Sequence, residues 1–157
     1  VEGLSQAFPE KAAEFAERGE AYKRTLLELH DWAGQRMALI DEGKRKLVTS
    51  HDAFAYFGRA YNIEVVGVQG ISTASEPSVA DRTRMVDFIK AHQIPAIFVE
   101  SSVNATLIEQ IGKDANVKVG GELFSDAMGN PGTPEGTYIG MVRHNIDTIV
   151  SGLLGES

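Results

Sequence analysis

The hydrophobic period of the chain changes within residues 47–57, which read Leu47-Val48-Thr49-Ser50-His51-Asp52-Ala53-Phe54-Ala55-Tyr56-Phe57. A short apolar run predicts a strand that ends at Ser50, and the spacing of Phe54, Phe57 and Tyr61 predicts a helix after it. His51 therefore falls at the carboxyl end of a strand, where open α/β sheets bind their ligands. An imidazole there can be a metal ligand, a general base or a helix cap, so its role depends on what other strand ends bring to it.

Strands and helices alternate beyond this stretch. We expect strands at residues 46–50, 63–68, 95–99 and 117–119, the last continuing towards Phe124, and helices at 53–61, 75–92, 101–111 and 138–153. The run from Pro95 to Val99 is continuously apolar, which is typical of a strand covered on both faces. The alternation predicts an α/β three-layer sandwich around a parallel sheet of about four strands.

One long helix is expected at the start of the chain. Pro9 suits its first turn, and no proline or hairpin signal follows until beyond Ile40. Apolar residues recur at steps of three or four from Ala12 to Met37. About 30 residues at 1.5 Å each give roughly 45 Å, which is longer than a domain of this size needs. The helix is either a packing helix or a rigid spine that carries another domain. In the second case we expect part of its apolar face, around Phe8, Phe15 or Tyr22, to be left uncovered.

The composition limits the classes of function. The 157 residues suffice for one domain with a substantial core, and the net charge of −7 argues against a nucleic-acid partner. There is no cysteine, so disulfides and thiolate zinc sites are excluded. No apolar run approaches the roughly 20 residues of a membrane span. The chain begins at Val1 rather than methionine, and we therefore expect it to be a piece of a longer protein.

Polar clusters follow three of the predicted strands: His51 after the first, Glu100-Ser101-Ser102 after the third, and Glu122 with Ser125-Asp126 after the fourth. Because parallel strands point their carboxyl ends the same way, these clusters can converge on one rim of the sheet. An imidazole and a carboxylate that meet there form half of a divalent-metal site. We expect His51 and Asp126 to lie close enough to share an ion.

Each of these residues also has a plainer interpretation. A single histidine at a helix start is more often a cap or a packing residue than a ligand, and Asp52 has the character of a helix cap. Asp126 precedes a glycine-rich loop, where it could serve a turn. Ser101 and Ser102 are expected to cap the helix after the third strand. The remaining histidines are interpreted as structural or solvent-facing: His30, His92 and His144.

Three blocks of the sequence carry a resemblance to a known family: Val48-Thr49-Ser50-His51-Asp52-Ala53-Phe54-Ala55-Tyr56-Phe57, Pro95-Ala96-Ile97-Phe98-Val99-Glu100-Ser101-Ser102 and Gly121-Glu122-Leu123-Phe124-Ser125-Asp126-Ala127-Met128. In type, order and spacing they resemble the metal-binding solute-binding proteins of zinc and manganese ABC importers, in particular the TroA-like group. A further segment, from Gly136 to Asp147, extends the similarity, which covers nearly the whole chain.

The resemblance implies a protein of two α/β lobes joined by a long rigid helix, with the metal held between the lobes by four side chains. Residues 1–40 correspond to the linker helix and residues 41–157 to the carboxyl-terminal lobe, while the amino-terminal lobe and its two histidines are absent. His51 takes the third ligand position and Asp126 the fourth. Glu100 and Ser101 are assigned only as residues that support the ligands without binding the ion themselves.

The same resemblance implies a non-enzymatic protein of the periplasm or another extracytoplasmic space, anchored to the membrane in its full-length form and serving an ABC permease. The sequence does not choose between zinc, manganese and iron as the cargo. With two of four ligands, the isolated chain is expected to bind metal weakly. The alternative is a metal-dependent hydrolase that uses His51, Glu100 and Asp126, since catalytic zinc needs an open position and a base. A third interpretation is an interaction module that binds no metal.

Overall fold

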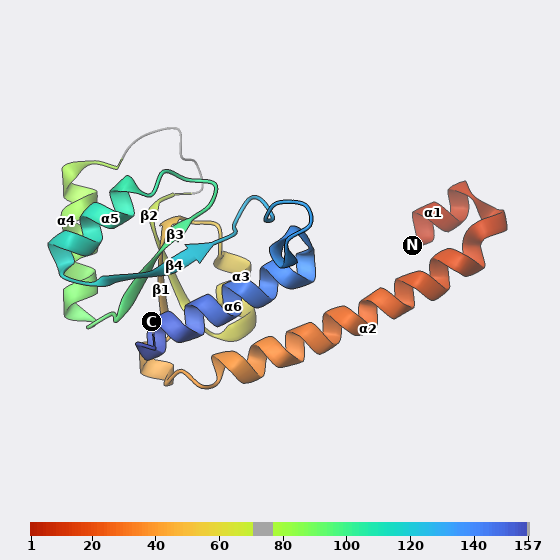
Figure 1. Cartoon of the computed structure of the whole chain (residues 1–157), viewed down its shortest axis with the longest axis horizontal. Helices are drawn as coiled ribbons and strands as arrows, with labels where there is room; N and C mark the ends of the chain where they lie inside the picture. Colours follow the sequence, from red (N-terminus) through yellow and green to blue (C-terminus); the bar gives the residue numbers. More distant parts are fainter. Residues whose placement is uncertain (71–76, 157) are drawn as a thin grey trace.

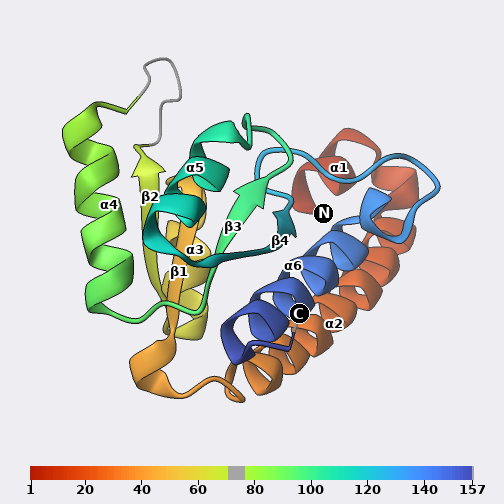
Figure 2. The ribbon, with the colours of Figure 1, turned by 60° about the vertical axis from the view of Figure 1, so that its left-hand side comes forward.

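Four parallel strands form the centre of the molecule in the computed structural model, which describes residues 1–70 and 77–156. They are β1 (Lys46–His51), β2 (Glu64–Gln69), β3 (Ala96–Glu100) and β4 (Lys118–Leu123). β1 pairs in parallel with β2 and β3 with β4, and the two pairs lie side by side through contacts of β1 with β3 (Figure 2). The spatial order is therefore β2, β1, β3, β4, which confirms the expected parallel α/β architecture.

Side chains that alternate along the strands build a core on each face of the sheet. Leu47 and Phe98 point into one core, which α3 (Ala55–Tyr61) and α6 (Tyr138–Leu154) help to form. Val48 and Ile97 point into the other, under α4 (Val79–Ala91) and α5 (Thr106–Ala115). Helices therefore lie on both faces (Figure 2). Burial on both faces accounts for the apolar sequence of β3.

The long helix α2 (Ala12–Met37) extends well past the sheet (Figure 1). Its carboxyl-terminal part packs against α6 and buries Leu29, Ala33 and Met37. Arg36 adds a polar contact, because its Nε donates to Oδ1 of Asp147 in α6 at 3.0 Å. The helix is thus fixed to the lobe through its last turns.

The amino-terminal segment turns back onto the free end of α2 (Figure 1). A helix from Pro9 onward was predicted, but the structure adds α1 (Glu2–Ala7) and opens the long helix with a 3-10 turn, η1 (Pro9–Lys11). Phe8 separates them with φ −134° and ψ 73°, because a residue before proline is disfavoured in helical geometry. Gly19 leaves room for this return, since a Cβ there would lie 2.3 Å from Cγ2 of Val1.

Part of the apolar face at this end is uncovered, as expected for a helix that outruns its domain. Phe8 is 49% exposed and Tyr22 51% exposed, and Leu4 and Leu27 are also exposed. Phe15 is partly buried, because its ring packs edge-on against Phe8 with centroids 6.5 Å apart. The expectation of an uncovered face is therefore confirmed at Phe8 and Tyr22.

Two predicted helix starts were wrong. α5 begins at Thr106 rather than at the serines after β3, because those serines form a turn and Asn104 Oδ1 accepts the Thr106 N–H at 2.8 Å. α3 begins at Ala55 after Phe54, so Asp52 is not its cap. Short 3-10 turns, η2 (Glu42–Lys44) and η3 (Pro134–Gly136), precede β1 and α6.

Helix α4 begins with a capping box in which Ser78 and Asp81 bond each other's backbone N–H groups. The Ser75 and Glu76 expected at its start, and the small polar residues before them, lie outside the described residues. Among residues 1–70 and 77–156, no helix combines the length and the apolar character that a membrane crossing requires.

Candidate metal centre

The polar residues expected at the strand ends meet at the topological switch point of the sheet, where the order in which strands are added reverses. The chain passes from β1 outward to β2, and then crosses to β3 and outward to β4. In open α/β sheets the crevice between the two halves, at the carboxyl ends of the strands, is the usual ligand site. His51 ends β1 and Glu100 ends β3, so both lie at this position.

Glu100 contacts both the backbone and the ring of His51. Its Oε1 accepts the backbone N–H of His51 at 2.8 Å, and its Oε2 lies 2.7 Å from Nδ1 of the imidazole. The histidine side chain is 4% exposed and the glutamate side chain fully buried. Carboxylates only accept hydrogen bonds, so a cation bound at Nε2 would place the ring hydrogen on Nδ1, beside Glu100. The lone pair of Nε2 would then be available to the cation.

Nε2 faces the carboxylate of Asp126. The Nε2–Oδ2 distance is 3.3 Å, and the Asp126 side chain is 66% exposed at the rim. Two ligands bound at 2.0–2.2 Å to one tetrahedral zinc ion lie about 3.3–3.5 Å apart. The spacing therefore suits a shared cation without any movement of either atom. The expectation that these residues lie on one rim is confirmed, while their role as ligands stays a prediction.

The backbone at His51 is shaped by its neighbours in sequence and in the sheet. The His51 carbonyl accepts the Ala53 N–H at 3.0 Å and the Thr49 hydroxyl at 2.9 Å, which ends β1 in a tight bend. Gly67 of β2 lies against this bend, since a Cβ there would lie 2.7 Å from the Asp52 nitrogen and from the His51 carbonyl carbon. Only a residue without a side chain lets the two strands approach so closely.

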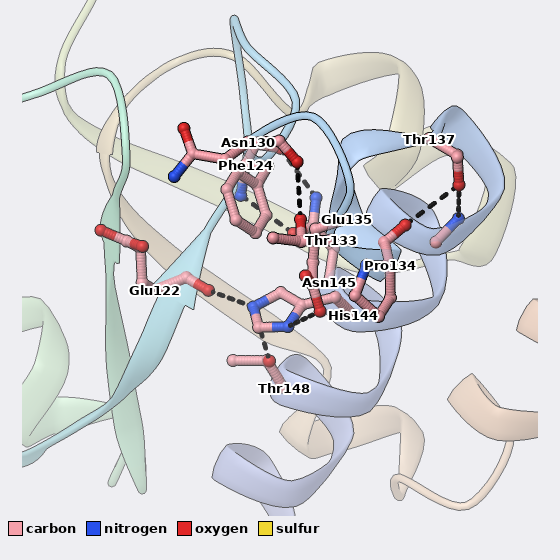
Figure 3. Close-up of polar contacts among 11 residues, drawn as sticks. Glu122, Phe124, Asn130, Thr133, Pro134, Glu135, Thr137, His144, Asn145 and Thr148 are labelled. Carbon is pink, nitrogen blue, oxygen red and sulfur yellow. Dashed lines mark hydrogen bonds and ion pairs between the residues drawn. The ribbon is translucent and has the colours of Figure 1, made fainter.

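Asp126 follows β4 by three residues, and helix α6 holds the segment that carries it (Figure 3). The Asn145 side chain accepts the Phe124 N–H at 2.9 Å and donates to the Phe124 carbonyl at 2.7 Å. His144 Nε2 donates to the Glu122 carbonyl at 2.9 Å. The sequence did not single out Asn145, because a lone asparagine within a helix carries no signal of a partner elsewhere in the chain.

The serines after β3 take different places from those expected. Ser101 is exposed, and its backbone N–H donates to the Leu123 carbonyl at 2.9 Å, which ties the ends of β3 and β4 together. Its side chain is not among the groups that contact His51 in the described structure. Ser102 instead shares a hydrogen bond of 2.8 Å with Ser125, the residue before Asp126. Glu100 contacts the side of His51 away from Asp126, and the position of Ser101 behind the ligands stays a prediction.

The other histidines take structural positions. His30 Nδ1 lies 3.1 Å from the Tyr61 hydroxyl, between α2 and α3. Burial, and secondarily the nearby Tyr138, raise the pKa of the Tyr61 hydroxyl, which keeps it a neutral hydrogen-bonding partner. His92 caps α4 and packs against Phe88, with the two rings tilted by 52° and their centroids 4.4 Å apart.

The site brings together two side chains of the kinds that bind metal ions. In the part of the chain that the structure describes, no group of three or more His, Asp or Glu side chains could surround one metal ion. His51 and Asp126 offer two donors, and Glu100 is directed at the back of the imidazole with no exposed oxygen. The hydrolase alternative needs a base that faces an open coordination position. Glu100 does not supply one.

Comparisons with known proteins agree with this architecture. The class they define is the metal-binding solute-binding proteins, about half of whose length this chain spans. The chain belongs to the ZnuA family, whose model, described as "Zinc-uptake complex component A periplasmic", matches residues 1–152.

Two curated relatives illustrate the similarity. The chain is 48% identical over 158 aligned residues to the zinc-binding protein TroA of Treponema pallidum, and 46% identical over 155 to the manganese-binding lipoprotein MntA of Bacillus subtilis. These alignments cover 97% and 96% of this chain and 51% of each relative. The chain thus spans about half the length of the curated relatives it matches.

The fold is similar to that of a solved structure. The periplasmic zinc-binding protein TroA from Treponema pallidum superposes with a TM-score of 0.93 at 47% sequence identity. The match covers 97% of this chain and 57% of that one. The chain accordingly corresponds to one lobe and its helix.

Proposed function

We propose that this chain is the linker helix and carboxyl-terminal lobe of a protein that captures zinc or manganese for an ABC importer. Residues 1–40 form the linker segment and residues 41–157 the lobe. The support is the similarity to the zinc-binding TroA and the manganese-binding MntA over half of their length. Relatives named as periplasmic proteins and lipoproteins support a place outside the cytoplasm, with a lipid anchor on the complete protein.

The observation that carries the proposal is the 3.3 Å separation of His51 Nε2 and Asp126 Oδ2. These atoms act as two of the metal ligands. Glu100 acts behind them, because a carboxylate on the second ring nitrogen orients a ligating histidine and raises its basicity. The imidazole suits zinc and other transition metals, and the carboxylate neutralises part of the ionic charge.

The missing ligands come from an amino-terminal lobe. A closed tetrahedral site needs four protein ligands, and two are available here. The uncovered apolar side chains at the amino-terminal end, which include Phe8 and Tyr22, form the surface on which that lobe packs. Apolar faces of this kind mark interaction sites. The isolated chain therefore holds its ion with water in the remaining positions, and holds it weakly.

Anomalous diffraction tests the assignment. Crystals of the chain soaked in zinc, and separately in manganese, are measured on both sides of the absorption edge of each metal. We expect one strong peak about 2.0–2.2 Å from both His51 Nε2 and Asp126 Oδ2. The D126N variant serves as the matched control and should lose the peak. A peak elsewhere on the lobe, present in both proteins, would overturn the proposal.

A further inference from the structure

The residue that precedes the Asp126 segment is held through its backbone. Phe124 is the first residue after β4, and both of its polar backbone groups bond to one side chain. Asn145 Oδ1 accepts the N–H at 2.9 Å and Asn145 Nδ2 donates to the carbonyl at 2.7 Å. Asn145 is 6% exposed within α6, so the amide is itself fixed by packing. Phe124 therefore has little freedom.

The residue before Asn145 in α6 holds the strand end itself (Figure 3). His144 donates from Nε2 to the Glu122 carbonyl at 2.9 Å, and its ring lies edge-on to Phe124 with centroids 5.2 Å apart. On the other side, Ser125 shares its hydroxyl hydrogen bond with Ser102 in the turn after β3. The residues before Asp126 are thus held by hydrogen bonds to α6 on one side and to the turn after Glu100 on the other.

We propose that Asn145 is a positioning residue for metal binding, which acts by fixing the backbone from which Asp126 extends. Two residues of chain span at most about 7 Å, so a fixed Phe124 keeps the Asp126 carboxylate near His51. A preorganised ligand loses less freedom when the ion arrives. This inference rests on the proposed function, because it assumes that Asp126 binds the ion.

A double-mutant cycle tests the inference. Zinc affinity is measured for the whole chain by NMR, from the backbone amide resonances of residue 51 and residues 124–126, up to millimolar zinc. We expect N145A to weaken binding about tenfold, as loss of groups that orient metal ligands commonly does. In a D126N background, N145A should have no further effect. A purely structural role would weaken both backgrounds alike.

Thr137→Ala is the matched control on the same helix. The Thr137 hydroxyl accepts the Gly140 N–H at 3.1 Å and donates to the Pro134 carbonyl at 3.0 Å, away from Phe124. T137A should lower the stability of the fold and leave zinc affinity unchanged. If N145A does not fold, N145D replaces it, because aspartate keeps the bond to the Phe124 N–H and loses the bond to the carbonyl. N145D should weaken binding in the parent chain and not in D126N.

The possible failures are distinguishable. Unchanged affinity in N145A, together with weaker binding in H51A and D126N, would overturn the positioning role alone. Equal losses from N145A with and without Asp126 would also overturn it. Unchanged zinc binding in both H51A and D126N would instead overturn the proposed function on which the inference rests.

Discussion

One carboxylate, that of Glu100, holds His51 at both its backbone and its ring: Oε1 accepts the His51 N–H at 2.8 Å while Oε2 lies 2.7 Å from Nδ1. The two residues end neighbouring strands and are almost fully buried. A buried carboxylate needs partners: Oε1 has a hydrogen bond, and Oε2 lies at ion-pair distance from the imidazole. The consequence is an imidazole with a fixed orientation and with Nε2 directed to the rim.

Replacing Glu100 by glutamine should invert the tautomer of His51. The carboxamide is nearly the same shape, but its NH2 group can donate to Nδ1, which moves the ring hydrogen to Nε2. We expect zinc affinity to fall about 10–100-fold, the usual range for loss of such a partner. Ring ¹⁵N shifts report the tautomer, and a titration reports the affinity. The exposed Glu122→Gln is the control for charge; equal affinities of E100Q and E122Q would contradict the role of Glu100.

Replacing Gly67 by alanine should destabilise the lobe and displace His51. The added Cβ would lie 2.7 Å from backbone atoms of His51 and Asp52, and backbone cannot move aside as a flexible side chain can. We expect the free energy of unfolding to fall by about 1–3 kcal/mol in urea denaturation. Gly34→Ala, in the last turn of α2 with open space around it, should instead raise stability by up to about 1 kcal/mol. A stable G67A with an unshifted His51 resonance would refute the close approach.

The start of α4 should lose stability in acid. Hydrogen bonds from the Ser78 side chain and then its backbone, followed by Arg84, lower the pKa of the Asp81 carboxyl from 3.8. A group whose pKa is lower in the folded state stabilises it above the unfolded pKa, and the contribution disappears as the pH falls through the folded pKa. We expect ¹³C titration to show the Asp81 pKa rising towards 3.8 in S78A. No change in that variant would mean that the capping box does not hold in solution.

The uncovered face of the long helix should make the isolated chain self-associate. Phe8 and Tyr22 are about half exposed, and apolar surfaces of this kind associate in water. We expect the sedimentation coefficient to rise with protein concentration, and the F8S/Y22S double variant to remain monomeric. Tyr56→Ser, at an exposed tyrosine on α3, is the control and should behave as the parent chain. A parent chain that is monomeric at every concentration would show that this face needs no partner.

The parts of the fold that could be predicted from the sequence are those set by local pattern. Apolar runs and helical spacing located the strands and most helices, and the strand ends placed His51, Glu100 and Asp126 on one rim. That convergence follows from parallel topology, which fixes the direction of every strand end. The resemblance to TroA-like proteins added the ligand positions, which no periodicity supplies.

The remaining features depend on contacts between distant residues. Asn145 bonds Phe124 across 21 positions of sequence, and nothing in its own helix marks it. The return of α1 onto α2 depends on the missing side chain at Gly19. The turn after β3 is held by hydrogen bonds to Leu123, at the end of β4, and to Ser125 after it. Serines have strong capping propensity, so sequence alone favoured a helix start where tertiary contacts make a turn.

The central claim, that His51 and Asp126 form one half of a metal site, is tested most directly by calorimetric titration of the metal-stripped chain with zinc at neutral pH. We expect weak binding of one ion per chain, since two of the four ligands of a closed site are present. The affinity should fall strongly in H51A and in D126N and be retained in D52N, the neighbouring carboxylate. Binding that persists undiminished in both H51A and D126N would contradict the account.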